Sequence, residues 1–120
     1  KAVNGQVNDL FYYYREQAAL KARQYQRALD DIVKAIELSP KDLTYRAEHA
    51  VVNLRVGRYE ESMKILNEIL KDEPKYGEAY RLLGLCQIQL KKTDEACGNF
   101  NKAKELGDPN VDELIKKYCK

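Results

Sequence analysis

The most informative stretch of the chain is residues 77–109, which read GEAYRLLGLCQIQLKKTDEACGNFNKAKELGDP. Apolar side chains recur in this stretch at the spacing of one face of an α-helix, first over about 77–90 and again over about 94–106. The second run ends near Pro109, and proline lacks the N–H that a continuing helix needs. The stretch therefore predicts two helices joined by a short turn.

The same two-helix pattern occurs three times along the chain, with a period of 34 residues and no gaps. The columns that carry the period are Ala28, Ser62 and Ala96; Tyr25, Tyr59 and Thr93; Ile32, Leu66 and Phe100; and Ala35, Ile69 and Ala103. Pro40 and Pro74 share a column whose third member is Asp108. A repeated unit of this length is typical of a helical solenoid.

The period divides the chain into units at 9–42, 43–76 and 77–109. In the first two units the predicted helices cover about 9–22 and 26–38, then 43–56 and 60–71. An amphipathic segment at 110–120 predicts a further helix that caps the last unit with a polar outer face. Residues 1–8 are polar and lack a helical stripe, so we interpret them as a linker or the remnant of an upstream segment.

The residues at the turns and the small residues within the helices are those that close helix packing requires. Gly57 lies at the turn of the second unit, where a left-handed backbone is easy for glycine, and Arg23 and Lys91 occupy that place in the other units. Small residues Ala50 and Gly84 lie midway along first helices, where helices pack closely. The column is broken by Glu16. Either the first helix pair is splayed there, or the carboxylate turns outward toward Arg15 or a missing upstream helix, and we favour the second interpretation.

Composition excludes several classes of protein. The 21 Lys and Arg residues are nearly balanced by 19 Asp and Glu, and a net charge of +2 argues against a dedicated nucleic-acid binder. No apolar run approaches the roughly 18 residues that a membrane span needs. We expect a soluble piece, either cytoplasmic or exported if a signal preceded Lys1.

The repeat resembles the tetratricopeptide repeat family, and the third unit carries the resemblance best. The matching positions there are Tyr80, Leu83, Gly84, Ala96, Phe100 and Ala103. The resemblance covers residues 9–109 and implies an all-α fold, a right-handed α-solenoid of three helix-turn-helix repeats with a C-terminal capping helix. It also implies an interaction scaffold whose first helices line a concave groove.

Mapping the family's groove positions onto this chain predicts which side chains would touch a ligand. The predicted groove residues are Tyr13, Gln17, Leu20, Lys21, Val51, Leu54, Arg55, Glu78, Arg81, Leu85, Ile88 and Gln89. The alternative is that part of the apolar floor is packed core between adjacent first helices.

Some relatives hold the free carboxylate of a chaperone tail through Lys, Asn and Arg at set groove positions. The corresponding residues here are Tyr13, Gln17, Glu48, Glu78 and Leu82, so that clamp is absent. A hydrophobic or amphipathic segment is the better prediction for the ligand.

The sequence thus predicts a protein-binding module. We interpret it as the C-terminal part of a longer bacterial protein. The alternative is an assembly element that self-associates or packs on missing upstream repeats. Of the consecutive tyrosines, we expect Tyr12 in the core, whereas Tyr13 or Tyr14 suits either role, as an anchor for a ligand or as cover for an upstream repeat.

Residues able to carry catalysis or bind a metal are scarce, and we predict neither an enzyme, a metal site nor a cofactor. His49 is the only histidine, in a column that suggests a partly buried structural role. The adjacent carboxylates Asp30 and Asp31, like Glu60 and Glu61, are interpreted as a solvated face.

The three cysteines form no Cys-x-x-Cys pair. Cys86 falls in a small apolar column and predicts a buried thiol. Cys97 and Cys119 lie on helices that we expect to be adjacent, which makes a bridge between them a hypothesis.

Overall fold

The computed structural model describes residues 8–119, and these residues form seven helices and no strand. The helices are α1 (Asp9–Lys21), α2 (Tyr25–Leu38), α3 (Leu43–Arg55), α4 (Tyr59–Asp72), α5 (Gly77–Gln89), α6 (Thr93–Glu105) and α7 (Asp112–Tyr118). The first six agree with the predicted segments to within a residue or so. The last begins after the turn at Pro109 and Asn110, later than predicted.

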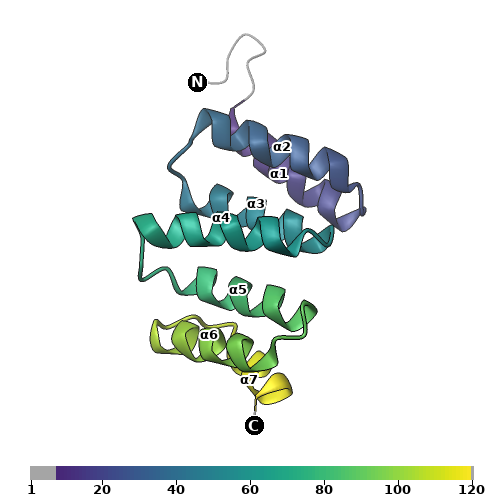
Figure 1. Ribbon diagram of the computed structural model, residues 1–120. Coiled ribbons are helices and arrows are strands. Elements are labelled where there is room, and N and C mark those ends of the chain that lie inside the picture. Colours follow the sequence, from purple (N-terminus) through teal and green to yellow (C-terminus); the bar gives the residue numbers. More distant parts are fainter. Residues whose placement is uncertain (1–7, 120) are drawn as a thin grey trace.

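The helices stack as antiparallel pairs along one axis, α1 with α2, α3 with α4 and α5 with α6 (Figure 1). Each helix contacts the next along the chain, and the first helices α3 and α5 also touch directly. The stack is elongated, with extents of 55 × 27 × 22 Å. The predicted all-α repeat solenoid is confirmed.

Small and large side chains alternate in the core as the repeat columns predict. Ala28, Ser62 and Ala96 have no exposed surface. The Ser62 hydroxyl donates a hydrogen bond of 2.7 Å to the carbonyl oxygen of Ala50 on the partner helix, so a buried polar group is satisfied. The small column thus sets how closely the two helices of a unit approach.

The tightest approach lies at Gly84 on α5. A Cβ atom added there would come within 2.4 Å of the ring of Phe100 on α6. Only glycine leaves room for a ring at this distance, which explains the pairing of the smallest residue of one column with the largest of the other.

Three tight turns end the first helices in the same way. Arg23, Gly57 and Lys91 all have positive φ, at 61°, 87° and 64°. In each turn the N–H of the following residue donates to a carbonyl five residues earlier, at 2.8 Å, as in the Schellman motif. The prediction of a left-handed residue at this place is confirmed, and the two non-glycine turns carry a strain of roughly 1 to 2 kcal/mol each.

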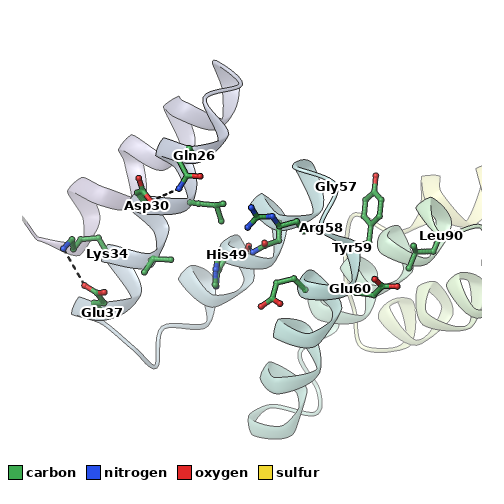
Figure 2. Close-up of a pocket in the computed structure, with 14 residues that line it drawn as sticks. Gln26, Asp30, Lys34, Glu37, His49, Gly57, Arg58, Tyr59, Glu60 and Leu90 are labelled. Carbon is green, nitrogen blue, oxygen red and sulfur yellow. Dashed lines mark hydrogen bonds and ion pairs between the residues drawn. The ribbon is translucent and has the colours of Figure 1, made fainter.

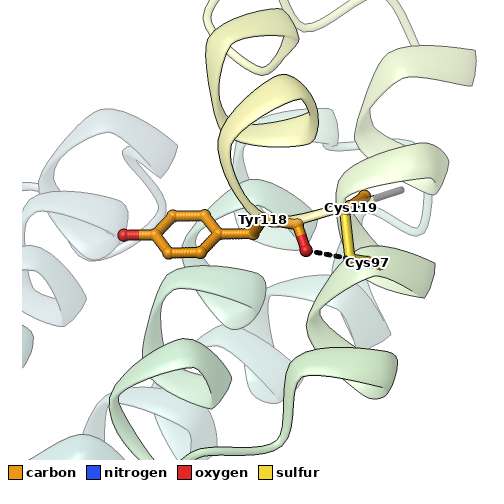
Figure 3. Close-up of a disulfide and its surroundings, with 3 residues drawn as sticks. All are labelled: Cys97, Tyr118 and Cys119. Atoms are coloured by element: carbon orange, nitrogen blue, oxygen red, sulfur yellow. Dashed lines mark hydrogen bonds between the residues drawn. A yellow bond between two sulfur atoms is a disulfide. The ribbon is translucent and has the colours of Figure 1, made fainter.

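At the other end of the chain, α7 covers the last helix pair. Val111, just before α7, is fully buried with Ala96, Phe100 and Ala103, and side chains of α7 pack against that cluster. A Cys97–Cys119 disulfide joins α6 to the residue after α7, with Cα atoms 5.8 Å apart (Figure 3). The hypothesised bridge is therefore present.

The sulfur atoms of Cys97 and Cys86 have different surroundings. The Cys97 sulfur also lies 3.6 Å from the carbonyl oxygen of Tyr118, a plain contact, because a disulfide sulfur carries no proton to donate. Cys86 is a buried free thiol, as predicted, and burial raises its pKa.

Residues 1–7 of the predicted linker lie outside the described residues. Asn8 is the N-cap of α1, and its side chain accepts a hydrogen bond of 3.0 Å from the N–H of Phe11.

Candidate functional site

The predicted groove residues come from the three first helices, α1, α3 and α5, and they differ in how far they reach solvent. Lys21, Arg55 and Gln89 are exposed, and Leu20 is buried. The partly exposed members are Tyr13, Gln17, Val51, Leu54, Glu78, Arg81, Leu85 and Ile88.

The apolar floor of this surface is continuous with the core. Leu20 is only 7% exposed and belongs to the core cluster of the first pair, so at this position the alternative interpretation as packed core holds. Val51 contacts the clusters of the first and second pairs, and Leu85 those of the second and third. With Leu54 and Ile88, these residues keep part of their apolar surface accessible.

In the third unit the two charged residues of the predicted groove, Glu78 and Arg81, already form ion pairs. The Arg81 guanidinium lies 3.1 Å from a carboxylate oxygen of Asp108, which is nearly buried, and 3.7 Å from Glu78. Glu78 also accepts a hydrogen bond of 3.1 Å from the Tyr76 hydroxyl. The ion pair between Arg81 and Asp108 was not predicted, although Asp108 stands in the column of Pro40 and Pro74, a signal that this position differs in the third unit.

The first unit contains a buried acid that the sequence did not predict correctly. Glu16 has no exposed surface, so our preferred interpretation of an outward-turned carboxylate is wrong. No N–H or O–H group of the described residues donates a hydrogen bond to its two oxygens. Glu48 on α3, which is partly exposed, is the neighbouring group that acts most strongly on the Glu16 carboxyl. Two ionised carboxylates have no donor between them, so they hydrogen-bond only when one holds a proton.

Electrostatics at this pair favour the protonated acid. Burial above all, then the Glu48 carboxyl and the charge of Asp31, raises the pKa of Glu16 to about 9. Burial, and after it the charge of Glu48, also raise the pKa of the Tyr13 hydroxyl.

Arg15 does not neutralise Glu16, because Asp31 on α2 already occupies it. The Arg15 fork donates two hydrogen bonds to the Asp31 carboxylate, at 2.8 and 3.0 Å. Asp31 is only 2% exposed, so the prediction that it belongs to a solvated face is wrong, whereas Asp30 is exposed as expected. The side chain of Arg15 also lies 5.0 Å above the ring of Phe11.

A second concave surface lies between α2 and α4 (Figure 2). This open cleft has a volume of about 1040 Å³ and contains none of the predicted groove residues. Lys34 and Glu37 on its α2 wall pair with each other at 3.7 Å. His49 enters from α3, and burial lowers its pKa, in keeping with the predicted structural role. The polar groups of the cleft are partly satisfied by one another, so its size alone does not favour it as the ligand site.

Within residues 8–119 no cluster of three or more His, Cys, Asp or Glu side chains is arranged to hold a metal ion. No helix of this part of the chain has the length and apolar character to cross a membrane.

A stack of antiparallel helix pairs with a 34-residue period defines the class of helical repeat solenoids. A family model described as tetratricopeptide repeat matches residues 19–82 and 53–98. The chain belongs to the tetratricopeptide repeat family.

Two curated fungal relatives match most of this chain but are much longer. Small glutamine-rich tetratricopeptide repeat-containing protein 2 of Mycosarcoma maydis is 30% identical over 99 residues, which cover 82% of this chain and 28% of that protein. Heat shock protein STI1 of Saccharomyces cerevisiae is 32% identical over 101 residues, 81% of this chain and 17% of that protein. Both are eukaryotic proteins, so the expectation of a bacterial source is not supported.

Among solved structures, the first TPR of Spaghetti (RPAP3) bound to the HSP90 peptide SRMEEVD superposes with a TM-score of 0.78. The match covers 92% of this chain and 90% of that one at 19% sequence identity. At this identity the likeness shows the fold.

Proposed function

We propose that the face formed by α1, α3 and α5 binds a peptide or protein segment. The observation that carries the proposal is the row of partly exposed apolar side chains, Val51, Leu54, Leu85 and Ile88, on adjacent first helices. A ligand that covers this row removes apolar surface from water, at about 25 cal/mol per Å². The RPAP3 domain, which shares the fold, binds a peptide, and this supports the same type of role here.

The chemistry of the surface favours a ligand unlike the HSP90 peptide of that structure. The positions that would hold a terminal carboxylate carry Tyr13, Gln17, Glu48, Glu78 and Leu82, with no Lys or Arg among them. The peptide SRMEEVD is itself acidic at its C-terminal end. Like charges would oppose each other, so we propose a hydrophobic or amphipathic segment without an acidic terminus.

Affinity capture from extract of the source cells tests this function. The intact chain is compared with a Leu54→Glu, Leu85→Glu double variant, whose fold is checked by circular dichroism, and retained proteins are identified by mass spectrometry. Val33→Glu with Leu38→Glu is the matched control, because these α2 residues are apolar, exposed and outside the proposed face. A partner lost with the first double variant alone supports the groove. Equal capture by all three baits contradicts it.

An assembly role is the second candidate, and it has an observation of its own. Leu10, Phe11 and Tyr14 on α1 are 46%, 42% and 60% exposed, an unusual concentration of large apolar surface at one end of the stack. Light scattering over a range of protein concentrations tests it. Self-association is supported if the mass of the intact chain rises with concentration while the Leu10→Ser, Phe11→Ser double variant keeps the mass of a monomer. A constant monomer mass contradicts it.

A further inference from the structure

Glu16 and Glu48, termed here the acid pair, lie where the first helices of units one and two meet. Glu16 is buried on α1 and Glu48 is partly exposed on α3, so the pair reaches from the interior to the surface. Two predicted groove residues of α1 lie close to Glu16 in sequence, Tyr13 three residues before it and Gln17 directly after it, and both carboxyls raise the pKa of Tyr13. The pair is therefore placed at the edge of the proposed binding face.

No basic group among residues 8–119 forms an ion pair with either member of the acid pair. From α2 the facing charge is Asp31, which is acidic and already bound by Arg15. From α1 itself the other titratable neighbour is Tyr13. Among residues 8–119 no side chain donates a hydrogen bond to Glu16, so the only donor between the two carboxyls is a proton that one of them holds. A cation that replaces this proton would serve both carboxyls.

The group that would replace the proton has the chemistry of an organic cation. Ca²⁺ and Mg²⁺ take six or more oxygen ligands, and the described residues contain no group of three or more His, Cys, Asp or Glu side chains arranged to hold a metal ion. A Lys ammonium brings three donors and an Arg guanidinium five, enough to serve both carboxyls at once. Such charge-assisted bonds are about twice as strong as neutral ones.

We propose that the acid pair is a subsite for a Lys or Arg side chain of the segment that binds in the groove. The inference rests on the proposed function, because the rest of the ligand must lie on the apolar row next to the pair. When the cation enters, the proton that the two carboxyls share passes to solvent. Ligand binding at this subsite is thus linked to proton release and strengthens as the pH rises.

The test uses pools of short peptides, acetylated and amidated at their ends, with one fixed central residue and random residues elsewhere. The fixed residue is Lys, Arg or norleucine, which matches the length of Lys without its charge. Retention of each pool on the immobilised chain is measured at pH 5.5 and pH 8. Glu16→Gln and Glu48→Gln remove the two charges in turn, and Glu68→Gln is the control because that residue is exposed on α4.

We expect the intact chain to retain the Lys and Arg pools about tenfold better than the norleucine pool at pH 8, and less so at pH 5.5. Both acid-pair variants should lose this preference while Glu68→Gln keeps it. Should Glu48→Gln fail to fold, Glu16→Gln alone decides, because the isosteric amide keeps the buried volume.

Two other outcomes separate the subsite from the groove. If all pools are retained equally and Leu54→Glu with Leu85→Glu abolishes retention, the groove stands and the subsite is wrong. The subsite is equally overturned if Glu16→Gln keeps the preference for Lys and Arg. If no pool is retained by the intact chain, the proposed function falls and the subsite falls with it.

Discussion

Replacing Glu16 by Gln should stabilise the fold, and by more at high pH than at low pH. The pKa of Glu16 is about 9 in the folded chain and 4.5 as an ordinary glutamate, so the folded state holds its proton more tightly than the unfolded state. The stabilisation from this proton is complete below pH 4.5 and is lost as the pH rises to 9. Each pKa unit corresponds to 1.36 kcal/mol, which gives a loss of up to about 3 kcal/mol between pH 4.5 and pH 7.

Gln is the right substitution because it has the size of Glu and behaves as a permanently neutral acid. Its amide can also donate a hydrogen bond to Glu48, which the ionised carboxylate cannot do. The variant should therefore gain about 1 to 3 kcal/mol over the intact chain at pH 7 and show a flatter dependence of stability on pH.

Urea unfolding followed by far-ultraviolet circular dichroism, at pH 5, 7 and 8.5, measures this difference. Glu68→Gln, an exposed change of the same kind, serves as the control and should leave the pH profile unchanged. Parallel profiles for the intact chain and Glu16→Gln would refute the reasoning, because they would mean that Glu16 is ionised in the folded state at no cost.

The remaining predictions concern the packing of the stack. Ala96→Leu should cost about 1 to 3 kcal/mol by overpacking a site with no free surface, whereas Lys102→Leu on the exposed side of α6 should be nearly neutral, and thermal melts that coincide would contradict this. Gly84→Ala should destabilise by a similar amount, since its Cβ would meet Phe100 at 2.4 Å, and urea midpoints measure it. Reducing the disulfide, which spans 22 residues, should lower the free energy of unfolding by about 3 kcal/mol, and an unchanged midpoint with dithiothreitol would count against that role. Deleting residues 110–120 should uncover the apolar side of the last pair and promote aggregation, which size-exclusion chromatography detects.

Much of the fold was predictable because helix periodicity, turns and the repeat columns can be recognised directly in the sequence. The positive φ of Arg23 follows from the place of Gly57 in the neighbouring unit, and the close contact at Gly84 follows from its column. What the sequence did not reveal are contacts between side chains far apart along the chain. Arg15 pairs with Asp31, which is 16 residues away, and not with its immediate neighbour Glu16, and the repeat columns contain no information on such a pairing.

The same limit applies to the candidate site. The family resemblance assigned the predicted groove residues to three first helices, but it could not show that Leu20 is buried or that Arg81 is paired with Asp108. Those outcomes depend on how adjacent units pack and on a substitution confined to the third unit. The break in the small-residue column at Glu16 was visible in the sequence, yet its meaning depended on Glu48, which lies on another helix.

Glu16 bears both on the stability of the fold and on the proposed binding of a cation. Its carboxylate lowers stability near neutral pH, and a small or neutral side chain at this place, as in the other two units, would avoid that cost. Destabilising groups of this type tend to occur where a ligand completes the site. The urea and peptide measurements on Glu16→Gln therefore have to be considered together. A variant that is more stable but has lost its preference for Lys and Arg identifies the carboxylate as a binding group, whereas a variant that is more stable and keeps the preference identifies it as a packing defect.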